Sequence, residues 1–261
     1  MIAVSGVTKT FGGSAAIQDI SFTAGRGEIF AFLGPNGAGK TTTISILTSL
    51  LKPSSGRVEI DGVDAINNPT ETRKRFGIVF QSETLVRELT AYENMDIYGS
   101  LYGVPRKLRT GRIKTLLILF DLWERRDDPV TRFSGGMRRR LEIARCLLHS
   151  PKIIFLDEPT LGLDPQTRHQ LWTQVRKLNQ QEGVTVFLTT HYMEEADRVA
   201  HRIAVIDHGQ IIALGSPAEL KQQTASDTLE KAFLALTGSR IREERANGLN
   251  RMRIIAKITG N

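Results

Sequence analysis

The residues best suited to chemistry form a glycine-rich stretch, Gly34-Pro35-Asn36-Gly37-Ala38-Gly39-Lys40-Thr41-Thr42. Apolar residues 29–33 precede it and an amphipathic run follows, which predicts strand, loop and helix. The glycines let backbone N–H groups converge on one anion, and the helix start adds a partial positive charge. That dipole contributes only about 0.3–1 kcal/mol. A triphosphate therefore needs the full charge of Lys40, and the Thr41 hydroxyl is suited to Mg²⁺.

Two adjacent carboxylates end a later apolar stretch. Residues 152–156 read as a buried strand that leads into Asp157 and Glu158. Burying two neighbouring charges is costly unless a cation lies close by. We therefore expect Asp157 to face Mg²⁺ through water and Glu158 to face an attacking nucleophile. The preceding phosphate-binding loop strengthens this interpretation of the acidic pair.

Single polar residues follow two other predicted strands. Gln81 comes directly after residues 76–80, and His191 stands just past residues 184–188. In open α/β sheets, ligands are met at the carboxyl ends of the strands. A lone histidine is more often structural, but this position favours a role of His191 near the terminal phosphate.

A second anion-ready helix start occurs at Phe133-Ser134-Gly135-Gly136-Met137. Ser134 is a natural helix N-cap, and the two glycines expose backbone N–H groups. The arginines at 138–140 could form a phosphate patch. On a helix their side chains fan out, so a solvated face is the simpler interpretation.

The elements that position these residues can be read along the chain. Residues 2–4 and 15–22 predict strands, and residues 57–63 predict a small hairpin that turns at Asp61-Gly62. The helix after the phosphate loop is expected to include Leu51 and to stop before Pro53. The first third of the chain therefore mixes the strand of the phosphate loop with antiparallel pieces.

The pattern then changes to helix over residues 90–122, with no strand signal, which predicts an inserted helical lobe at about 85–150. Strands return afterwards, beginning with the one that ends at Asp157. The other expected elements are helices that begin at Asp164-Pro165 and at Ser216, a hairpin over residues 202–214, and a last helix that ends at Gly238.

Length and composition limit the possible classes of protein. The chain has 261 residues, a formal net charge of +7 and a single cysteine, Cys146. An internal disulfide is excluded, and the apolar neighbours of Cys146 predict a buried structural thiol. No apolar run approaches the ~18–20 residues of a membrane span, and residues 1–4 do not begin a signal peptide. We therefore expect a cytoplasmic chain unless a partner holds it at a membrane.

The positive charge is concentrated near the C-terminus. Residues 240–261 hold six basic and two acidic side chains, or +4 of the total. A solvated tail is the simplest interpretation, and contact with anionic lipid head groups is the alternative. This distribution weakens a nucleic-acid interpretation of the charge.

The motifs occur in the order typical of ABC-type ATPase subunits, which the chain resembles from about Val4 to Leu220. The matching sequences are the phosphate loop, Gln81, Ser134-Gly135-Gly136, Asp157-Glu158-Pro159-Thr160, Gly162-Leu163-Asp164 and His191. The resemblance implies a P-loop NTPase fold of the α/β class, with a RecA-like, mostly parallel core sheet, an antiparallel β subdomain and an inserted helical lobe. It implies an ATPase domain over residues 1–220, and a C-terminal helix and basic tail over residues 221–261.

The resemblance also implies roles for single residues. Phe11 would stack on adenine, and the loop from Gly34 to Thr42 would grip phosphate. The Mg²⁺ ligands, direct or through water, would be Thr41, Gln81 and Asp157. Glu158 would polarise the attacking water, and His191 would contact the γ-phosphate. Ser134, Gly135, Gly136 and Met137 would act on a nucleotide held by a second subunit, with Asp164 as a dimer contact.

Two positions depart from the common family pattern. Met137 stands where the family commonly has glutamine, and Phe11 stands where tyrosine is usual. Serine and the glycines are intact, so activity is expected to survive, whereas Met137 lacks the side-chain amide that the family commonly has there. The methionine variant, residues 190–197 and residues 229–238 resemble the drug-resistance and nodulation-type branch of exporters.

One chain thus offers two phosphate-ready helix starts but only one lysine loop and one acidic pair. We expect two copies to enclose two ATP molecules, and their closure to drive a separate membrane permease. No nucleic-acid partner is expected. Rival interpretations are a small-molecule kinase, a DNA-repair ATPase and a translation-factor ATPase. The first would lack Ser134-Gly135-Gly136, the second needs a long coiled coil, and the third carries two such cassettes.

Overall fold

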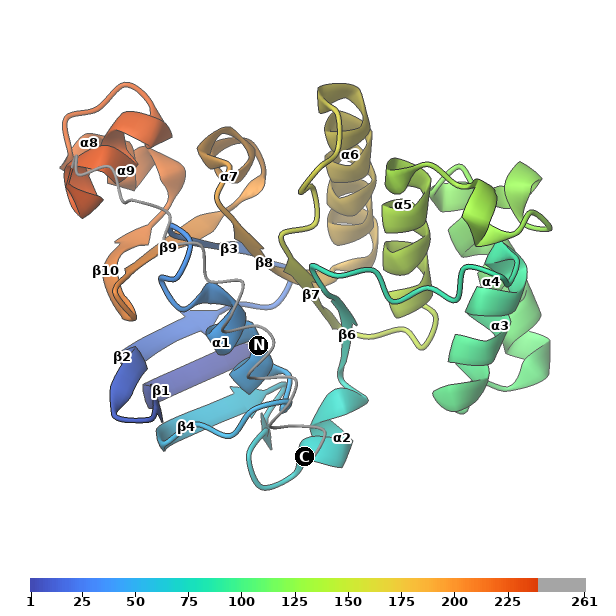
Figure 1. Cartoon of the computed structure of the whole chain (residues 1–261), viewed down its shortest axis with the longest axis horizontal. Helices are drawn as coiled ribbons and strands as arrows, with labels where there is room; N and C mark the ends of the chain where they lie inside the picture. Colours follow the sequence, from blue (N-terminus) through green and yellow to red (C-terminus); the bar gives the residue numbers. More distant parts are fainter. Residues whose placement is uncertain (239–261) are drawn as a thin grey trace.

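Two sheets organise the computed structural model, which describes residues 1–238 (Figure 1). The basic tail expected at residues 240–261 lies outside the described residues. One sheet has four strands in the order β2-β1-β4-β5, and the other has six in the order β10-β9-β3-β8-β7-β6. The predicted combination of a core sheet with a separate antiparallel subdomain is therefore confirmed.

The six-stranded sheet is parallel apart from one edge strand. Its parallel members are β9 (Arg202–Asp207), β3 (Ile29–Leu33), β8 (Thr185–Thr190), β7 (Ile153–Asp157) and β6 (Phe76–Val79). The edge strand β10 (Gln210–Gly215) pairs antiparallel with β9. All residues of β3, β7 and β8 are buried, which explains their continuous apolar runs, since helices cover both faces of a parallel sheet.

The four-stranded sheet is antiparallel. It consists of β1 (Ile2–Phe11), β2 (Ser14–Ala24), β4 (Ser55–Ile60) and the short β5 (Val63–Asp64). The strand predicted at residues 2–4 extends to Phe11, because the β1–β2 pairing absorbs register shifts between Val4 and Thr10. A stack of aromatic rings joins the two sheets: the Phe30 ring lies 5.4 Å from Phe22 and 5.7 Å from Phe187.

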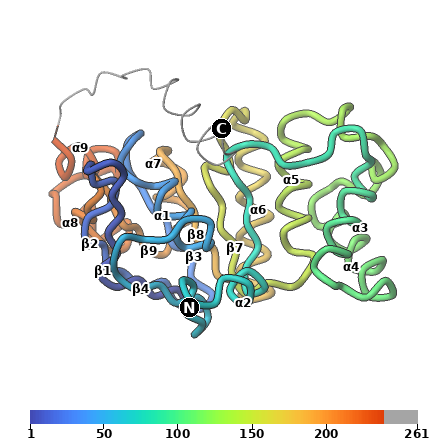
Figure 2. Tube along the Cα trace, turned by 60° about the horizontal axis from the view of Figure 1, so that its bottom comes forward, coloured from blue at the N-terminus to red at the C-terminus, as the bar shows by residue number. Residues whose placement is uncertain are grey.

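The helical lobe lies at the far end of the molecule from β1 and β2 (Figures 1 and 2). It contains α3 (Ala91–Leu101), α4 (Arg106–Leu119), two short 3₁₀ turns at Trp123–Arg125 and Val130–Arg132, and α5 (Gly135–Cys146). The helical pattern predicted over residues 90–122 is divided at Gly103-Val104-Pro105, where glycine takes a positive φ and proline precedes the next helix.

The other helices are α1 (Lys40–Leu47), α2 (Pro69–Arg73), α6 (Pro165–Glu182), α7 (Met193–Val199), α8 (Pro217–Gln223) and α9 (Leu229–Thr237). The expectation that the helix after the loop includes Leu51 is wrong. It ends at Leu47, and Ser49 turns the chain with a left-handed φ of 58°. None of the helices within residues 1–238 is both long and apolar enough to cross a bilayer.

Candidate active site

The carboxyl ends of four neighbouring parallel strands bring the predicted chemistry to one edge of the core sheet. Strand β3 leads into Gly34, β6 into the segment with Gln81, β7 into Glu158 and β8 into His191. The register places Asp157 opposite Thr189. Residues far apart in the sequence therefore meet, as expected for a ligand site in an open α/β sheet.

The phosphate loop turns into α1 at Gly39, whose φ of 109° is unfavourable for any residue with a Cβ atom. A Cβ at Gly39 would also lie 2.8 Å from the Ala16 carbonyl oxygen. No described side chain caps α1, so the backbone N–H groups at its start are available to an anion. The local geometry is thus that of a phosphate cradle.

Lys40 is nearly buried and points back across this loop. Its Nζ donates to the carbonyl oxygens of Gly34 at 2.7 Å and Pro35 at 3.3 Å, and it lies 3.4 Å from Oε1 of Glu158. Burial lowers the pKa of Lys40 below its usual value, and the Glu158 carboxylate offsets part of that effect. A phosphate arriving here would meet a cation already surrounded by oxygen acceptors.

Glu158 connects two of the predicted site residues. Its backbone has a left-handed φ of 49°, which turns the chain so that Asp157 and Glu158 are directed to different partners. Oε1 faces Lys40, and Oε2 lies 2.7 Å from Nδ1 of His191. The structure therefore brings Lys40, Glu158 and His191 together.

Asp157 is held by a residue that the sequence did not single out. Thr189 donates its hydroxyl to Oδ1 of Asp157 at 2.6 Å, and the Thr189 hydroxyl oxygen accepts the N–H of Glu158 at 3.0 Å. Burial raises the pKa of Asp157 above its usual value, and the bond from Thr189 offsets part of the rise. The available signal was a pair of threonines at the end of a strand beside the acidic pair.

The donor set suits Mg²⁺, which usually takes one or two carboxylates, water and substrate phosphates rather than a cage of protein ligands. Residues 1–238 contain no cluster of three or more His, Cys, Asp or Glu side chains suited to a metal. Asp157 offers its second carboxylate oxygen, Thr41 is exposed on α1, and the side-chain amide of Gln81 bonds no described residue.

The second helix start is open to solvent. Ser134 caps α5 by accepting the N–H of Met137 at 3.2 Å, and both Ser134 and Gly135 are exposed. Gly136 differs, because a Cβ there would lie 2.3 Å from Cγ2 of Thr167 on α6. No hydrogen bond or ion pair among the described residues joins Ser134 to Lys40 or Glu158.

Among the described residues, Asp164 and Phe11 make no hydrogen bond or ion pair with Asp157 or Glu158. Asp164 caps α6 by accepting the N–H of Thr167 at 3.0 Å and its hydroxyl at 2.6 Å, and these bonds hold the pKa of Asp164 below its usual value. Phe11 ends β1 with 48% of its surface exposed, and Nζ of Lys9 lies 5.1 Å from its ring centroid. An exposed ring is available for stacking.

The arginines at 138–140 do not form a solvated face, so that interpretation is wrong. Arg139 is 8% exposed, and Arg138 and Arg140 are half-buried. Each guanidinium donates to a backbone carbonyl oxygen: Arg138 to Phe133, Arg139 to Phe80 and Arg140 to Phe120. The triplet is structural because α5 lies between the core sheet and the other helices of the lobe.

A buried contact links the loop after Glu158 with α7. The Thr160 hydroxyl donates to Oε2 of Glu195 at 2.7 Å, and Nη1 of Arg168 lies 3.7 Å from Oε1. The Arg168 guanidinium also lies 4.9 Å from the ring of Tyr192, whose centroid lies 4.1 Å from that of the His191 ring. Sequence reasoning missed Glu195, because its role depends on contacts between distant segments.

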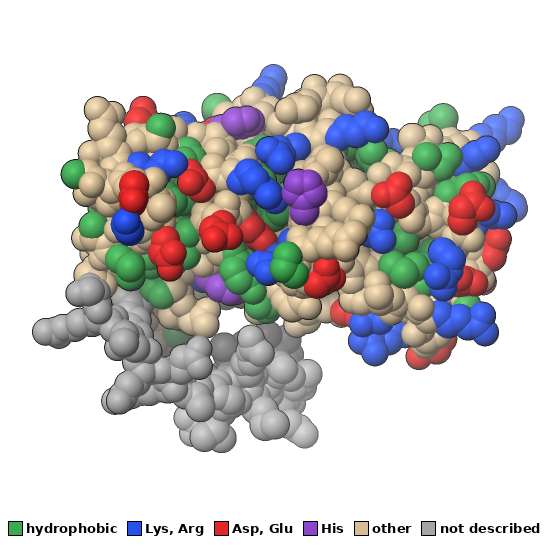
Figure 3. Space-filling view, turned by 90° about the horizontal axis from the view of Figure 1, so that it is seen from above, with side chains coloured by type: hydrophobic (Ala, Val, Ile, Leu, Met, Phe, Trp, Pro, Cys, Tyr) green, Lys and Arg blue, Asp and Glu red, His purple; other side chains and the backbone are tan. Residues whose placement is uncertain are grey.

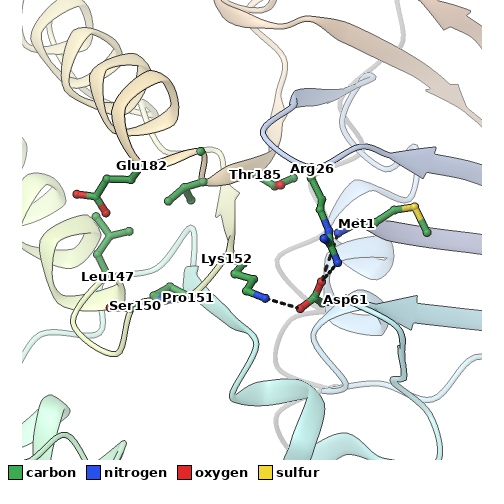
Figure 4. Close-up of a pocket in the computed structure, with 11 residues that line it drawn as sticks. Met1, Arg26, Asp61, Leu147, Ser150, Pro151, Lys152, Glu182 and Thr185 are labelled. Atoms are coloured by element: carbon green, nitrogen blue, oxygen red, sulfur yellow. Dashed lines mark hydrogen bonds and ion pairs between the residues drawn. The ribbon is translucent and has the colours of Figure 1, made fainter.

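A cavity of about 390 Å³ lies at the opposite edge of the core sheet, where β7 and β8 begin (Figure 4). Asp61 from the β4–β5 turn faces Arg26 at 3.2 Å and Lys152 at 3.5 Å across it, and Arg75 lies 3.7 Å away. None of the predicted site residues lines this cavity. Its ion pairs tie the antiparallel sheet to the core.

Fold and site together define a P-loop NTPase. A family model described as "ABC transporter" matches residues 17–161, more than half of the chain. A second model, described as "AAA domain, putative AbiEii toxin, Type IV TA system", matches the shorter stretch 129–197.

Similar proteins include daunorubicin resistance ATP-binding protein DrrA3 of Streptomyces coeruleorubidus, which is 42% identical over 88% of this chain and 72% of its own length. Nod factor export ATP-binding protein I of Ralstonia nicotianae is 41% identical over 84% of this chain and 68% of its own length. Linearmycin resistance ATP-binding protein LnrL of Bacillus subtilis is 38% identical over 93% of this chain and 76% of its own length.

Solved structures with a similar fold are ATP-binding subunits of ABC transporters. An ATP-binding subunit of an ABC transporter superposes with a TM-score of 0.82 at 28% identity, over 90% of this chain and 99% of that one. A dimeric ATP-binding cassette in a post-hydrolysis state with ADP and Pi has a TM-score of 0.74 at 30% identity, over 83% and 98%. The chain belongs to the ABC transporter family, as a subunit that binds and hydrolyses ATP.

Proposed function

We propose that two copies of this chain pair head to tail and that each ATP lies between the phosphate loop of one copy and Ser134 of the other. The observation that carries this proposal is the open start of α5. Ser134 and Gly135 are exposed and have no described bond to their own chain's Lys40 or Glu158. A similar cassette is described as dimeric, which supports pairing of two chains.

Within such a pair, Glu158 would accept a proton from the attacking water, and His191 would orient its carboxylate through the 2.7 Å contact. Thr41, Gln81 and Asp157 would hold Mg²⁺, which neutralises charge on the β- and γ-phosphates. ATP would favour the closed pair through its higher affinity for that state, and loss of the γ-phosphate would favour opening.

The output would be export of a substrate through a separate membrane permease, as the names of the resistance and export relatives suggest. Under this proposal the chain is cytoplasmic and sits at the inner face of the membrane through that permease. Acidic and basic side chains are interspersed on the face shown in Figure 3, which gives no support to a nucleic-acid track.

Complementation between two inactive variants tests the shared sites. Lys40→Ala removes the phosphate-loop cation and Ser134→Arg blocks the second helix start, so each variant alone should be inactive. If the sites are shared, a mixed pair holds one intact site, and an equal mixture should recover about a quarter of wild-type hydrolysis by random pairing. If each chain forms its own complete site, the mixture stays inactive and the proposal fails.

A further inference from the structure

The segment after β6, residues 80–84, has no regular secondary structure and is held by one face of α5. Four side chains of α5 reach it, at the i, i+1, i+4 and i+7 spacing of a single helix face. They are Arg138, Arg139, Glu142 and Arg145, and we call this group the α5 clamp.

Arg139 bonds the backbone on both sides of the Gln81 Cα. Its Nη1 donates to the Phe80 carbonyl oxygen at 2.6 Å, and its Nη2 donates to the Gln81 carbonyl oxygen at 3.2 Å. A planar guanidinium can make both bonds at once, whereas an ammonium group offers one point charge. The backbone position of Gln81 therefore depends on a side chain from another part of the chain.

Glu142 completes the grip. Its Oε2 lies 2.9 Å from Nη1 of Arg139, and its Oε1 accepts the Thr84 N–H at 2.8 Å and the Thr84 hydroxyl at 3.1 Å. Arg139 and Glu142 are only 8% and 3% exposed. Buried ion pairs of this kind are weak evidence for stability, but they favour one geometry over others when every donor and acceptor is used.

Ser134 caps the start of the same helix, about 1.4 turns before Arg139 at 3.6 residues per turn. We propose that Arg139 and Glu142 are positioning residues that fix Gln81 to the helix start at Ser134. Gln81 faces the chain's own nucleotide site, and Ser134 would face the partner's. The α5 clamp then makes the two groups move as one body, so that occupancy of one site changes the other. This inference rests on the proposed pairing.

The test replaces Arg139 by lysine in the full chain, and Arg140→Lys is the matched control. Arg140 is the next residue of the same helix and also donates to a backbone carbonyl oxygen, that of Phe120 at 3.0 Å, with Asp121 at 3.6 Å. It does not contact residues 80–84. Both variants keep the charge, so a general effect on α5 should appear in both.

Hydrogen exchange of the backbone amides measures directly whether the α5 clamp holds residues 80–84. This measurement does not depend on the pairing of two chains. The Thr84 amide bonds to Glu142, so Arg139→Lys should accelerate exchange over residues 80–84 about tenfold, and Arg140→Lys should leave it unchanged. Unchanged exchange in Arg139→Lys overturns the clamp. Should Arg139→Lys fail to fold, Glu142→Gln is the second variant: its amide NH2 would face the Nη1 donor of Arg139, so exchange over residues 80–84 should again accelerate, and unchanged exchange overturns the clamp.

The ATP dependence of hydrolysis reports the coupling. Wild type and Arg140→Lys should show a Hill coefficient above one, and the coefficient of Arg139→Lys should move towards one. Faster exchange with an unaltered Hill coefficient overturns the coupling. A wild-type coefficient of one together with failed complementation overturns the pairing and the coupling with it, whereas the exchange result still decides the clamp.

Discussion

The Nζ atom of Lys40 lies 3.4 Å from Oε1 of Glu158, and both side chains are nearly buried. The cation suited to hold phosphate and the carboxylate suited to accept a proton are thus paired with each other. Under the proposed mechanism, an incoming phosphate takes Lys40 from Glu158 before the carboxylate acts on water, which would link binding and activation through one ion pair.

Glu158→Gln should separate these steps. The amide cannot accept a proton, so kcat should fall about 10²–10⁴-fold, and ATP should bind as tightly as to wild type or more so, because a competitor for Lys40 is gone. Phosphate release and calorimetric titration of ATP measure the two effects. Glu194→Gln, an exposed neighbour of the site, is the control. Normal turnover in Glu158→Gln would refute its role as base.

Asp157→Asn tests the magnesium assignment. The asparagine oxygen can still accept the Thr189 hydroxyl, so the geometry should persist while the charge is lost. ATP binding in EDTA should be unchanged, whereas the gain in affinity on adding Mg²⁺ should shrink about 10–100-fold. Titration of ATP with and without Mg²⁺ checks this, with the exposed Asp127→Asn as control. A full Mg²⁺ effect in Asp157→Asn contradicts the assignment.

Gly136→Ala and Gly135→Ala should differ sharply in stability. A Cβ at Gly136 would meet Cγ2 of Thr167 at 2.3 Å, and the bonds of Thr167 to Asp164 hold that side chain in place. Gly136→Ala should cost about 1–3 kcal/mol in urea unfolding, and Gly135→Ala close to nothing. Thr167→Ser removes the methyl group but keeps the hydroxyl, so it should rescue Gly136→Ala. Equal losses in the two alanine variants would exclude this explanation.

His149 predicts a loss of stability in mild acid. Burial lowers the pKa of His149 from its usual 6.5 to about 4, while its Nε2 bonds the Phe76 carbonyl oxygen. Between these values the unfolded chain binds a proton that the folded chain does not, so stability falls as the pH drops through this window.

We expect His149 to account for about 2 kcal/mol of that loss, because the ring is only partly exposed. Urea unfolding at pH 7 and pH 4.5 measures it. His149→Gln can still donate to Phe76 and should lose less, whereas the exposed His169→Gln should behave as wild type. Parallel losses in all three proteins would remove His149 as the cause.

The positions of the candidate site residues could be predicted from the sequence, because each follows a strand or starts a helix within a short motif. Lys40, Gln81, Asp157 and His191 were placed correctly at one edge of the sheet on that basis. The contacts of these residues could not be predicted in the same way. The pairing of Asp157 with Thr189, for example, depends on the register of two strands.

In the helical lobe, the burial and contacts of side chains could not be predicted from local sequence patterns. A surface arginine and a buried one look alike in the sequence, so the role of Arg139 depended on the docking of α5 beside residues 80–84. The end of α1 at Leu47 was missed for another reason, because its apolar spacing continues to Leu51 although the backbone turns at Ser49.

The Asp61 carboxylate fixes the starting points of three core strands whose carboxyl ends lie at the candidate active site. Its carboxylate gathers Arg26, Arg75 and Lys152, each of which lies just before a core strand. Those strands end at Leu33, Val79 and Asp157 and lead into the segments with Gly34, Gln81 and Glu158. The count of residues along each strand, at about 3.3 Å apiece, then determines where its last side chain stands. One residue added within β7 would carry Asp157 into the place of Glu158 and displace Glu158 from Lys40, although the ion pairs of Asp61 would be unchanged.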